Sequence, residues 1–400
     1  MPALIMRLAP VLLAFLCGCA SRPPAVPTTW TLPSGSFLSA TGEPLSDGHV
    51  VAYTSTKDFI LVGESHTNPC DHAVQAHIIE ILAQSGMHFS IGLEMLPVTA
   101  QPVLERFNAG RISPHDLGRE VGWEKLWGHP YAQYLPIFEK ARAYGLPVVA
   151  LNIPRKVVNR YRDQGTAGLD EGERNLLPRR IVEASPVQRN ALLEQVDMHQ
   201  KMREAEPARG DLVPSASNPM ASMAERFFLV QALWDSMMAE QALAWRSRLD
   251  LPMLILAGSG HVEHGWGIEY RLQTLDAQAR CLSIMPVRDR EDFQMQADAS
   301  QRALPGDSLF FSCPSQHKSR LGMNIVFESG QLKIDSVDTD SLADRAGMRP
   351  GDVLIAAGGN NLTEVTDLHF AAMASSRQKK PLQLTVRRAN QDIVLHIPLD

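Results

Sequence analysis

The chain has 400 residues, a formal net charge of −6 and 44% hydrophobic positions. A chain of this length and composition can bury more than one core, so we expect two domains. The acidic balance argues against a surface that binds nucleic acid and against a polybasic surface that binds membranes.

The N-terminus predicts export and lipid attachment. Arg7 precedes an apolar segment, 8–16, which is too short to span a bilayer and is typical of a signal peptide. The following letters, "LCGC", resemble a bacterial lipobox, which implies that residues 1–18 are removed and that Cys19 carries the lipid. Ala20 then implies delivery to the outer membrane, facing the periplasm. The alternatives are an ordinary secretory peptide cut nearby and a membrane helix.

Three thiols remain if the leader is processed in this way, namely Cys70, Cys281 and Cys313. This odd number allows at most one disulfide within the chain in an oxidising compartment. Residues 19–36 are rich in Pro, Ser and Thr and predict an extended tether between the lipid and the folded part.

Residues 37–290 alternate strand-like and helix-like runs. "FILVG" and "FSIGL" are apolar runs of strand length, and "DHAVQAHIIEILAQSG" between them has apolar residues at helical spacing. The alternation predicts an α/β domain with a mostly parallel sheet flanked by helices. Residues 178–250 contain no convincing strand and predict a helical insertion, with an exposed loop at 207–219.

The composition changes after residue 290. Residues 291–318 are polar and weakly patterned, which predicts a linker. Residues 319–400 have short alternating runs around one helix and predict a small, mainly antiparallel β domain.

The segment "SLADRAGMRPGDVLIAAGGNNL" resembles a PDZ domain, and the resemblance covers 321–399. It implies that the loop Leu321-Gly322-Met323 binds the terminal carboxylate of a peptide through backbone N–H groups. The strand that starts at Asn324 would pair with the same peptide, which would come from a membrane or periplasmic protein. The alternative is a spacer or a homodimer contact with its groove filled.

Polar residues follow four predicted strands of the larger domain. In a parallel sheet, ligands and chemistry gather beyond the carboxyl ends of the strands, so these side chains are expected to share one crevice. Glycines at the same ends permit tight turns and close approach of a ligand. A set of Glu and His can orient a general-base histidine or bind a divalent metal, and the spacing excludes neither. The side chains are Glu64, His66, Glu94, Asn152 and His261.

This part of the chain resembles the ChaN-like haem-binding lipoproteins of the wider Tiki, TraB and erythromycin-esterase superfamily. The resemblance covers roughly 29–287 and rests on "ILVGESHTNPCDHAVQ", "IGLEML", "YLPIFEKARAYGLPVVALNIPR", "LVQALWDSMMAEQ" and "GSGHVEHGWGIEYRL". The superfamily carries a Gly-Glu-x-His, a later glutamate and a Gly-x-x-His, which here imply Glu64, His66, Glu94 and His261. Where relatives often show paired histidines, this chain has Asp71-His72.

The resemblance implies haem binding in iron uptake by a membrane-anchored protein. The sequence has no C-x-x-C-H attachment motif, so the haem would be bound non-covalently. A haem needs an axial ligand such as His or Tyr, for which Tyr131, Tyr134 and His199 are the candidates. The related esterases and proteases imply a second reading, a hydrolase in which Glu64 helps His66 activate water. The third reading is a non-catalytic adaptor whose PDZ-like domain recruits a membrane protein.

Overall fold

The computed structural model describes residues 32–190, 193, 219–303, 308–319, 321–328, 330–362, 365–378 and 380–399. The expected leader with Cys19 and the haem-ligand candidate His199 lie outside these residues, as do residues 207–218 of the loop expected at 207–219. No helix in the described part of the chain is both long enough and apolar enough to cross a membrane.

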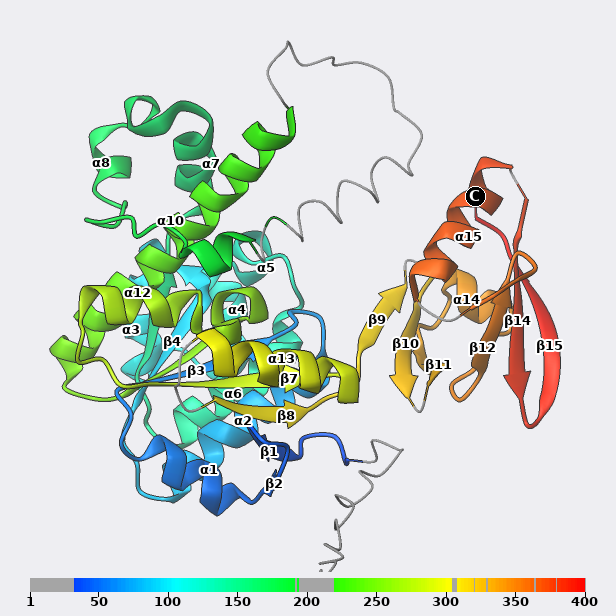
Figure 1. Ribbon diagram of the computed structural model, residues 1–400, viewed down its shortest axis with the longest axis horizontal. Helices are drawn as coiled ribbons and strands as arrows, with labels where there is room; N and C mark the ends of the chain where they lie inside the picture. The colour runs from blue at the N-terminus through cyan, green and yellow to red at the C-terminus, as the bar shows by residue number, and fades with distance from the viewer. Residues whose placement is uncertain are drawn as a thin grey trace, which may run out of the picture. The chain divides into compact units, whose positions relative to one another are not determined.

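A sheet of eight strands forms the centre of the larger domain (Figure 1). The order across it is β2-β1-β8-β7-β3-β6-β4-β5, in which the strands from β8 to β5 are parallel and β1 and β2 add antiparallel at one edge. This confirms the predicted α/β class with a mostly parallel sheet. The strands are β1 (Phe37–Ser39), β2 (Pro44–Leu45), β3 (Phe59–Glu64), β4 (Ser90–Pro97), β5 (Val148–Asn152), β6 (Met253–Gly258), β7 (Cys281–Val287) and β8 (Ser308–Ser312).

Helices cover both faces of this sheet because its parallel strands are buried on both sides. In β3, Ile60 and Val62 join the core that includes side chains of α2, α3, α4 and α6, while Phe59 and Leu61 point to the opposite face. The helices and 3-10 turns are α1 (Asp47–Thr54), α2 (Pro69–Gln84), η1 (Val98–Ala100), α3 (Gln101–Asn108), α4 (Pro114–Val121), α5 (Trp123–Leu126), α6 (Tyr131–Ala143), α7 (Arg155–Gln164), η2 (Gly165–Gly168), α8 (Glu171–Arg174), α10 (Pro219–Leu249), α11 (Ser259–Val262), η3 (Glu263–Gly265), α12 (Ile268–Leu275) and α13 (Arg290–Ala303).

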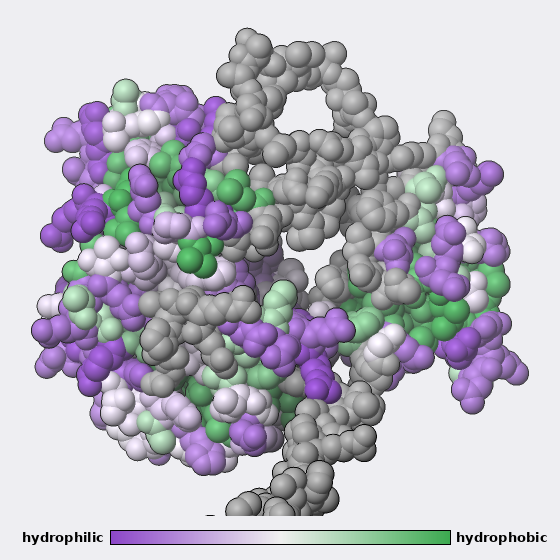
Figure 2. All heavy atoms as spheres, viewed as in Figure 1, coloured by the Kyte–Doolittle hydropathy of each residue, from purple (hydrophilic) through white to green (hydrophobic). Residues whose placement is uncertain are grey.

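The second face carries α7, α10, α12 and α13. Val157 of α7 packs with Leu233 and Met237 of α10, and Phe293 of α13 meets Phe310 of β8 ring to ring. On the side seen in Figure 2, apolar side chains show between hydrophilic ones over α7 and α10. The long helix α10 lies within the expected helical insertion.

The expected linker over 291–318 is wrong. Residues 290–303 form α13, and 308–312 form β8, which pairs with β7 on one side and β1 on the other. The polar sequence of α13 suits a helix with one buried edge, and the run "SLFFS" has the length of a strand but stands alone among polar residues. Its register beside β7 is a tertiary contact that no local pattern specifies.

One disulfide closes the end of this domain. Cys70, in the first turn of α2, is bonded to Cys313, which directly follows β8. Cys281 is free and buried in β7. The odd number of thiols therefore leaves the buried one unpaired.

The C-terminal domain is an antiparallel sheet of order β15-β14-β12-β11-β10-β9, with β13 beside β12. The first strand of this sheet begins a few residues before residue 319, where the sequence predicts the start of the domain. Asp352 of the "PGD" turn is buried and accepts two hydrogen bonds of 2.6 Å from the Arg388 guanidinium. The elements are β9 (Gln316–Ser319), β10 (Met323–Glu328), β11 (Gln331–Val337), α14 (Leu342–Arg345), β12 (Val353–Ala357), β13 (Asn360–Asn361), α15 (Val365–Arg377), β14 (Leu382–Arg388) and β15 (Gln391–Ile397).

Candidate functional site

Three adjacent parallel strands supply the centre of the site. β6 lies between β3 and β4, although it follows them by more than 150 residues, so the strand order reverses at this point. Glu64 and Gly258, the last residues of β3 and β6, are register partners. They border a cleft of about 680 Å³, lined by Glu64, Ser65, His66, Gln231, Gly258, Ser259, Gly260, His261, Pro286, Arg288, Asp289, Asp292, Gln296 and Ser315.

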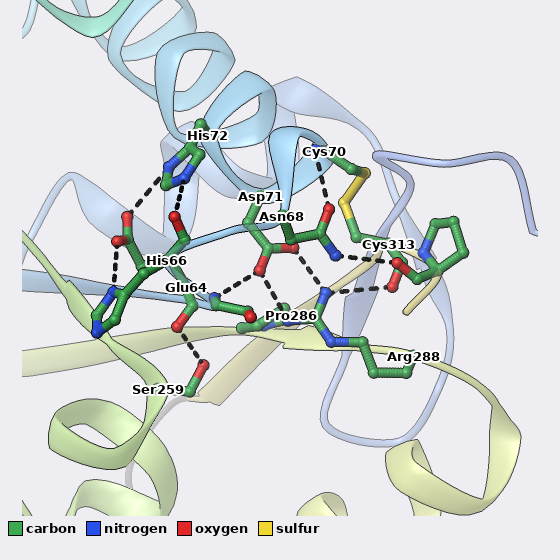
Figure 3. A network of polar contacts seen from close by, with 12 residues as sticks. Glu64, His66, Asn68, Cys70, Asp71, His72, Ser259, Pro286, Arg288 and Cys313 are labelled. Atoms are coloured by element: carbon green, nitrogen blue, oxygen red, sulfur yellow. Dashed lines mark hydrogen bonds and ion pairs between the residues drawn. A yellow bond between two sulfur atoms is a disulfide. The ribbon is translucent and has the colours of Figure 1, made fainter. Parts of the chain in front are cut away.

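Glu64 is a fully buried carboxylate that contacts three side chains. Its Oε1 accepts a 2.6 Å hydrogen bond from the Tyr134 hydroxyl and lies 2.9 Å from His66 Nδ1. Its Oε2 lies 3.2 Å from His72 Nδ1 (Figure 3). Burial by itself would raise the pKa of Glu64, but the contacts with His66 and His72 outweigh it and lower the pKa to about 2. The group is therefore ionised at neutral pH.

His66 carries an imidazole that is open to the cleft. Its side chain is 32% exposed, and Nδ1 is held by Glu64, which fixes the orientation of the ring. Within the described residues no hydrogen bond engages Nε2, which leaves that nitrogen for a ligand. Burial lowers the pKa of His66, but the nearby carboxylates Glu64 and Glu94 outweigh it, so the pKa is raised.

Gly258 leaves room for this ring. A Cβ at Gly258 would lie 2.6 Å from His66 Cε1 and 3.5 Å from Glu94 Oε2, so both side chains approach the same glycine. A Cβ at Gly260 would meet nothing within 4 Å. The first glycine of "GSGH" is therefore required by packing, whereas the second is not.

Aromatic rings flank His66 on its other side. The ring centroid of Trp127 is 4.7 Å away and that of His129 is 5.3 Å away. The indole N–H of Trp127 donates to the Tyr134 hydroxyl, 3.0 Å distant. This chain of contacts ties the residues beside the cleft to the buried Glu64.

A second acid–histidine group joins Glu94 of β4, which directly follows the last residue paired with β6, to His261 of α11. His261 is buried, with Nε2 at 3.3 Å from Glu94 Oε1 and Nδ1 at 2.6 Å from Asp235 Oδ1. Burial lowers the pKa of His261, but these two carboxylates outweigh it and raise the pKa to about 10. Glu94 also accepts the Gly258 N–H at 2.6 Å, and its pKa is lowered by His261 and His66 against the effect of burial.

The turn that carries His66 is held in place by Asp71. Asp71 accepts the Ser65 N–H at 2.7 Å and binds the Arg288 guanidinium through both oxygens at 2.7 Å (Figure 3). The Cys70–Cys313 disulfide lies beside this pair. Asp71 therefore anchors the turn, while His72 contacts Glu64.

The structure brings together Glu64, His66, Glu94 and His261, as the sequence predicts, and their chemical roles stay predictions. Asn152 is used structurally, because its amide donates to the Glu94 carbonyl at 2.9 Å.

Tyr134 and Tyr131 do not present free phenols. Tyr134 is 1% exposed and its hydroxyl is shared by Glu64 and Trp127. The Tyr131 hydroxyl donates to the Pro114 carbonyl at 2.5 Å. An axial ligand needs an atom that the iron can reach, so these positions do not support the expected tyrosine ligation.

Sequence reasoning missed Gln231 and Asp235 of α10. Gln231 Nε2 lies 3.0 Å from His261 Nδ1, and Asp235 is the acid partner of the same ring. Their spacing of four residues within a helix places them on one face. The spacing of Gln231 and Asp235 in "LVQALWDSMMAEQ" is the feature of the sequence from which this pair could have been found.

No cluster of three or more His, Cys, Asp or Glu suited to a metal ion occurs in the part of the chain that the structure describes. The divalent metal that the sequence left open therefore receives no support.

In the C-terminal domain, the loop that is expected to bind a peptide has a backbone conformation that favours glycine. Gly322 has φ +82°, and a Cβ there would lie 2.2 Å from Ser341 Cβ. Leu321 and Met323 are buried in the domain core, and the Asn324 amide donates to the Ser336 hydroxyl at 2.7 Å. Peptide recognition here would therefore use the backbone.

Comparison with known proteins identifies both domains. A family model described as haem-binding uptake, Tiki superfamily, ChaN matches residues 50–272, which is more than half of the chain. The chain belongs to this ChaN family. A PDZ-domain model matches residues 333–388. Both resemblances seen in the sequence are thereby confirmed.

Several solved structures are similar to parts of this chain. ChaN of Campylobacter jejuni, a structure of cofacial haem binding, is 17% identical, with a TM-score of 0.50 over 69% of this chain and 96% of that chain. The PDZ domain of EpsC from Vibrio cholerae is 22% identical over 22% of this chain and 92% of that chain, with a TM-score of 0.16. An erythromycin esterase, EreC, is 14% identical over 63% of this chain and 78% of that chain, with a TM-score of 0.35. A comparison with curated proteins finds no match.

We expect Gly258→Ala to displace the His66 ring of this ChaN-family domain, because the new Cβ would overlap Cε1. Such overpacking costs about 1–3 kcal/mol of unfolding free energy. Urea unfolding and the NMR signal of His66 Hε1 measure the effect, and Gly260→Ala is the matched control. Equal stability and an unmoved His66 signal in both variants would contradict this packing.

We expect the stability that His261 contributes to depend on pH. Its pKa is about 10 in the folded state and about 6.5 when unfolded, so the contribution is complete below pH 6.5 and is lost as the pH rises towards 10. His261→Gln should therefore cost about 3–5 kcal/mol at pH 6 and much less at pH 10. Denaturant unfolding at pH 6, 8 and 10 measures the difference from wild type.

The exposed His77 provides the control for that series. Its side chain is 43% exposed, so His77→Gln should differ little from wild type at any of these pH values. A gap for His261→Gln that stays constant from pH 6 to pH 10 would show that His261 is neutral in the folded protein.

Proposed function

We propose that this protein is a lipid-anchored haem-binding protein of the bacterial cell envelope that takes part in haem or iron uptake. Membership of the ChaN family supports haem as the ligand, and the lipobox-like leader supports the anchor. The observation that carries the proposal is the His66 imidazole, with one nitrogen held by buried Glu64 and the other facing the cleft.

The residue types around His66 are ones that can bind haem. An imidazole nitrogen is a common axial ligand of haem iron, and His66 presents one at a cleft whose volume lies within the usual range for small-molecule sites. The cleft lining itself is mainly polar. The rings of Trp127 and His129 pack against His66 from outside the cleft and help to hold the imidazole in place.

Bound haem would supply an iron atom that accepts a neutral imidazole nitrogen. The chain's own contribution is to hold that imidazole in place: Glu64 accepts the Nδ1 proton, which leaves Nε2 unprotonated in the neutral ring and makes it more basic. Tyr134 and His72 in turn hold Glu64. His66 therefore replaces Tyr131 and Tyr134 as the ligand that we propose.

The PDZ domain would give this protein a second kind of partner. Domains of this class take up the C-terminal end of a peptide as an added strand. We propose that it docks the C-terminus of a membrane or periplasmic protein, which would bring the haem-binding domain close to that protein.

A specific observation also favours hydrolysis as a second candidate function. A carboxylate–histidine pair with its second nitrogen open to a polar cleft is the arrangement of a general base that activates water. However, a protonated ring neither accepts a proton nor binds iron, so the raised pKa of His66 does not separate the two functions, whereas the family match supports haem. We therefore place haem binding first.

We expect purified wild-type protein to bind haem with a shifted Soret band and His66→Ala to lose at least about tenfold in affinity, because the iron ligand is removed. His77→Ala, which deletes an exposed imidazole of the same domain, should bind like wild type. Absorption titration measures both. Equal haem binding by all three proteins would exclude His66 as the ligand, and absence of binding in wild type would favour the hydrolase.

We expect Cys19→Ser to release the protein from membranes, because the thiol that accepts the lipid is lost. Cys17→Ser is the matched control and should remain membrane-bound. Fractionation of cells and incorporation of labelled fatty acid measure the outcome. A Cys19→Ser protein that still carries fatty acid would contradict the assignment of the anchor.

A further inference from the structure

Both edges of strand β10 are occupied by the chain itself. β11 pairs with one edge, and β9 pairs antiparallel with the other, with Ser319 opposite Met323 and His317 opposite Ile325. The pairing continues one residue upstream, where the Ser315 carbonyl accepts the Phe327 N–H at 3.2 Å. An extended peptide can add only to an unpaired edge. β10 therefore offers no edge to a peptide while β9 is in place.

The N–H groups of the expected carboxylate loop are used as well. Leu321 N–H donates to the Ser319 hydroxyl at 3.1 Å, and Gly322 N–H donates to the Ser319 carbonyl at 3.0 Å. These are two of the three backbone donors that the PDZ resemblance assigns to a terminal carboxylate. The hydroxyl and carbonyl oxygens of Ser319 thus accept the hydrogen bonds that the two carboxylate oxygens of a peptide would otherwise accept.

We propose that residues 316–319 are an internal ligand of the PDZ domain, so that an extended peptide with a free C-terminal carboxylate binds only after β9 leaves β10. Two independent contacts carry this inference, namely the occupied edge of β10 and the loop donors held by Ser319. It rests on the peptide-binding function proposed above and adds that this function is self-inhibited.

The residues just upstream keep the internal strand close to its position. Cys313 is held by the disulfide to Cys70, and the Pro314 carbonyl accepts a 2.9 Å hydrogen bond from the Asn68 amide. A tethered segment of this kind competes at an effective concentration of the order of millimolar. If the strand is bound about 99% of the time, the apparent Kd of an external peptide is raised about 100-fold.

The hydrogen-bond ladder between β9 and β10 suggests two proline variants that should differ in their effect. Because hydrogen-bonded pairs alternate along an antiparallel ladder, the bond between Phe327 and Ser315 predicts that His317 bonds to β10 through its N–H and that the Gln316 N–H points away. His317→Pro removes a ladder donor, whereas Gln316→Pro removes none. Ser319→Ala removes only the hydroxyl that accepts Leu321 N–H.

The test uses the full chain with its disulfide intact and a fluorescent peptide, Pro-Ser-Gln-His-Lys-Ser, which copies 314–319 and ends in a free carboxylate. We expect His317→Pro to bind this peptide at least about tenfold more tightly than wild type, with a smaller gain for Ser319→Ala. Gln316→Pro should stay within about twofold of wild type. The same peptide with an amidated C-terminus should bind more weakly to every protein.

Amide hydrogen exchange of Ile325 and Phe327 shows whether the edge of β10 that faces β9 is paired. Both amides should be protected in wild type and lose protection in His317→Pro, while Ile334 of the domain core stays protected and shows that the fold is intact. Equal peptide binding by wild type and His317→Pro overturns the self-inhibition and leaves peptide binding standing. No peptide binding by any variant, although the two amides are exposed in His317→Pro, overturns the peptide-binding function and the inference with it.

Discussion

The larger domain depends on the buried carboxylate of Glu64. An ionised group without solvent is costly unless charged or hydrogen-bonded partners replace the water. Here the partners come from a turn, from α2 and from α6, in the form of His66, His72 and Tyr134. These elements can keep their positions only together, because the loss of one partner leaves the charge exposed to an apolar interior. The orientation of His66 is a consequence of that requirement.

The order of the strands then determines what meets this carboxylate. β6 enters the sheet between β3 and β4, and a crevice forms where the order reverses. Gly258 at the end of β6 leaves space for His66, and its N–H binds Glu94. In the second buried group, His261 lies between Glu94 and Asp235, and the Arg271 guanidinium lies 3.5 Å from Asp235. The two acid–histidine groups therefore share one glycine and one cleft, although only His66 is open to a ligand.

The PDZ domain follows a related principle, because its binding groups already have partners. Ser319 takes the loop donors and β9 takes the edge of β10, so the backbone of the domain is satisfied without an external peptide. In the larger domain, by contrast, the His66 Nε2 remains without a partner among the described residues. One domain thus offers an open ligand atom, whereas the other must first give up an internal contact.

The sequence by itself determined the α/β class and singled out Glu64, His66, Glu94 and His261, because strand period, glycine turns and polar endings are local signals. Its resemblance to a known family identified the PDZ domain. It did not determine the linker region, since the placing of β8 beside β7 is a pairing between distant segments. Nor did it reveal that Tyr134 holds Glu64, that Asp235 holds His261 or that β9 fills the edge of β10. Those contacts join residues on separate elements, and only the packing of the whole chain decides which polar atom faces which.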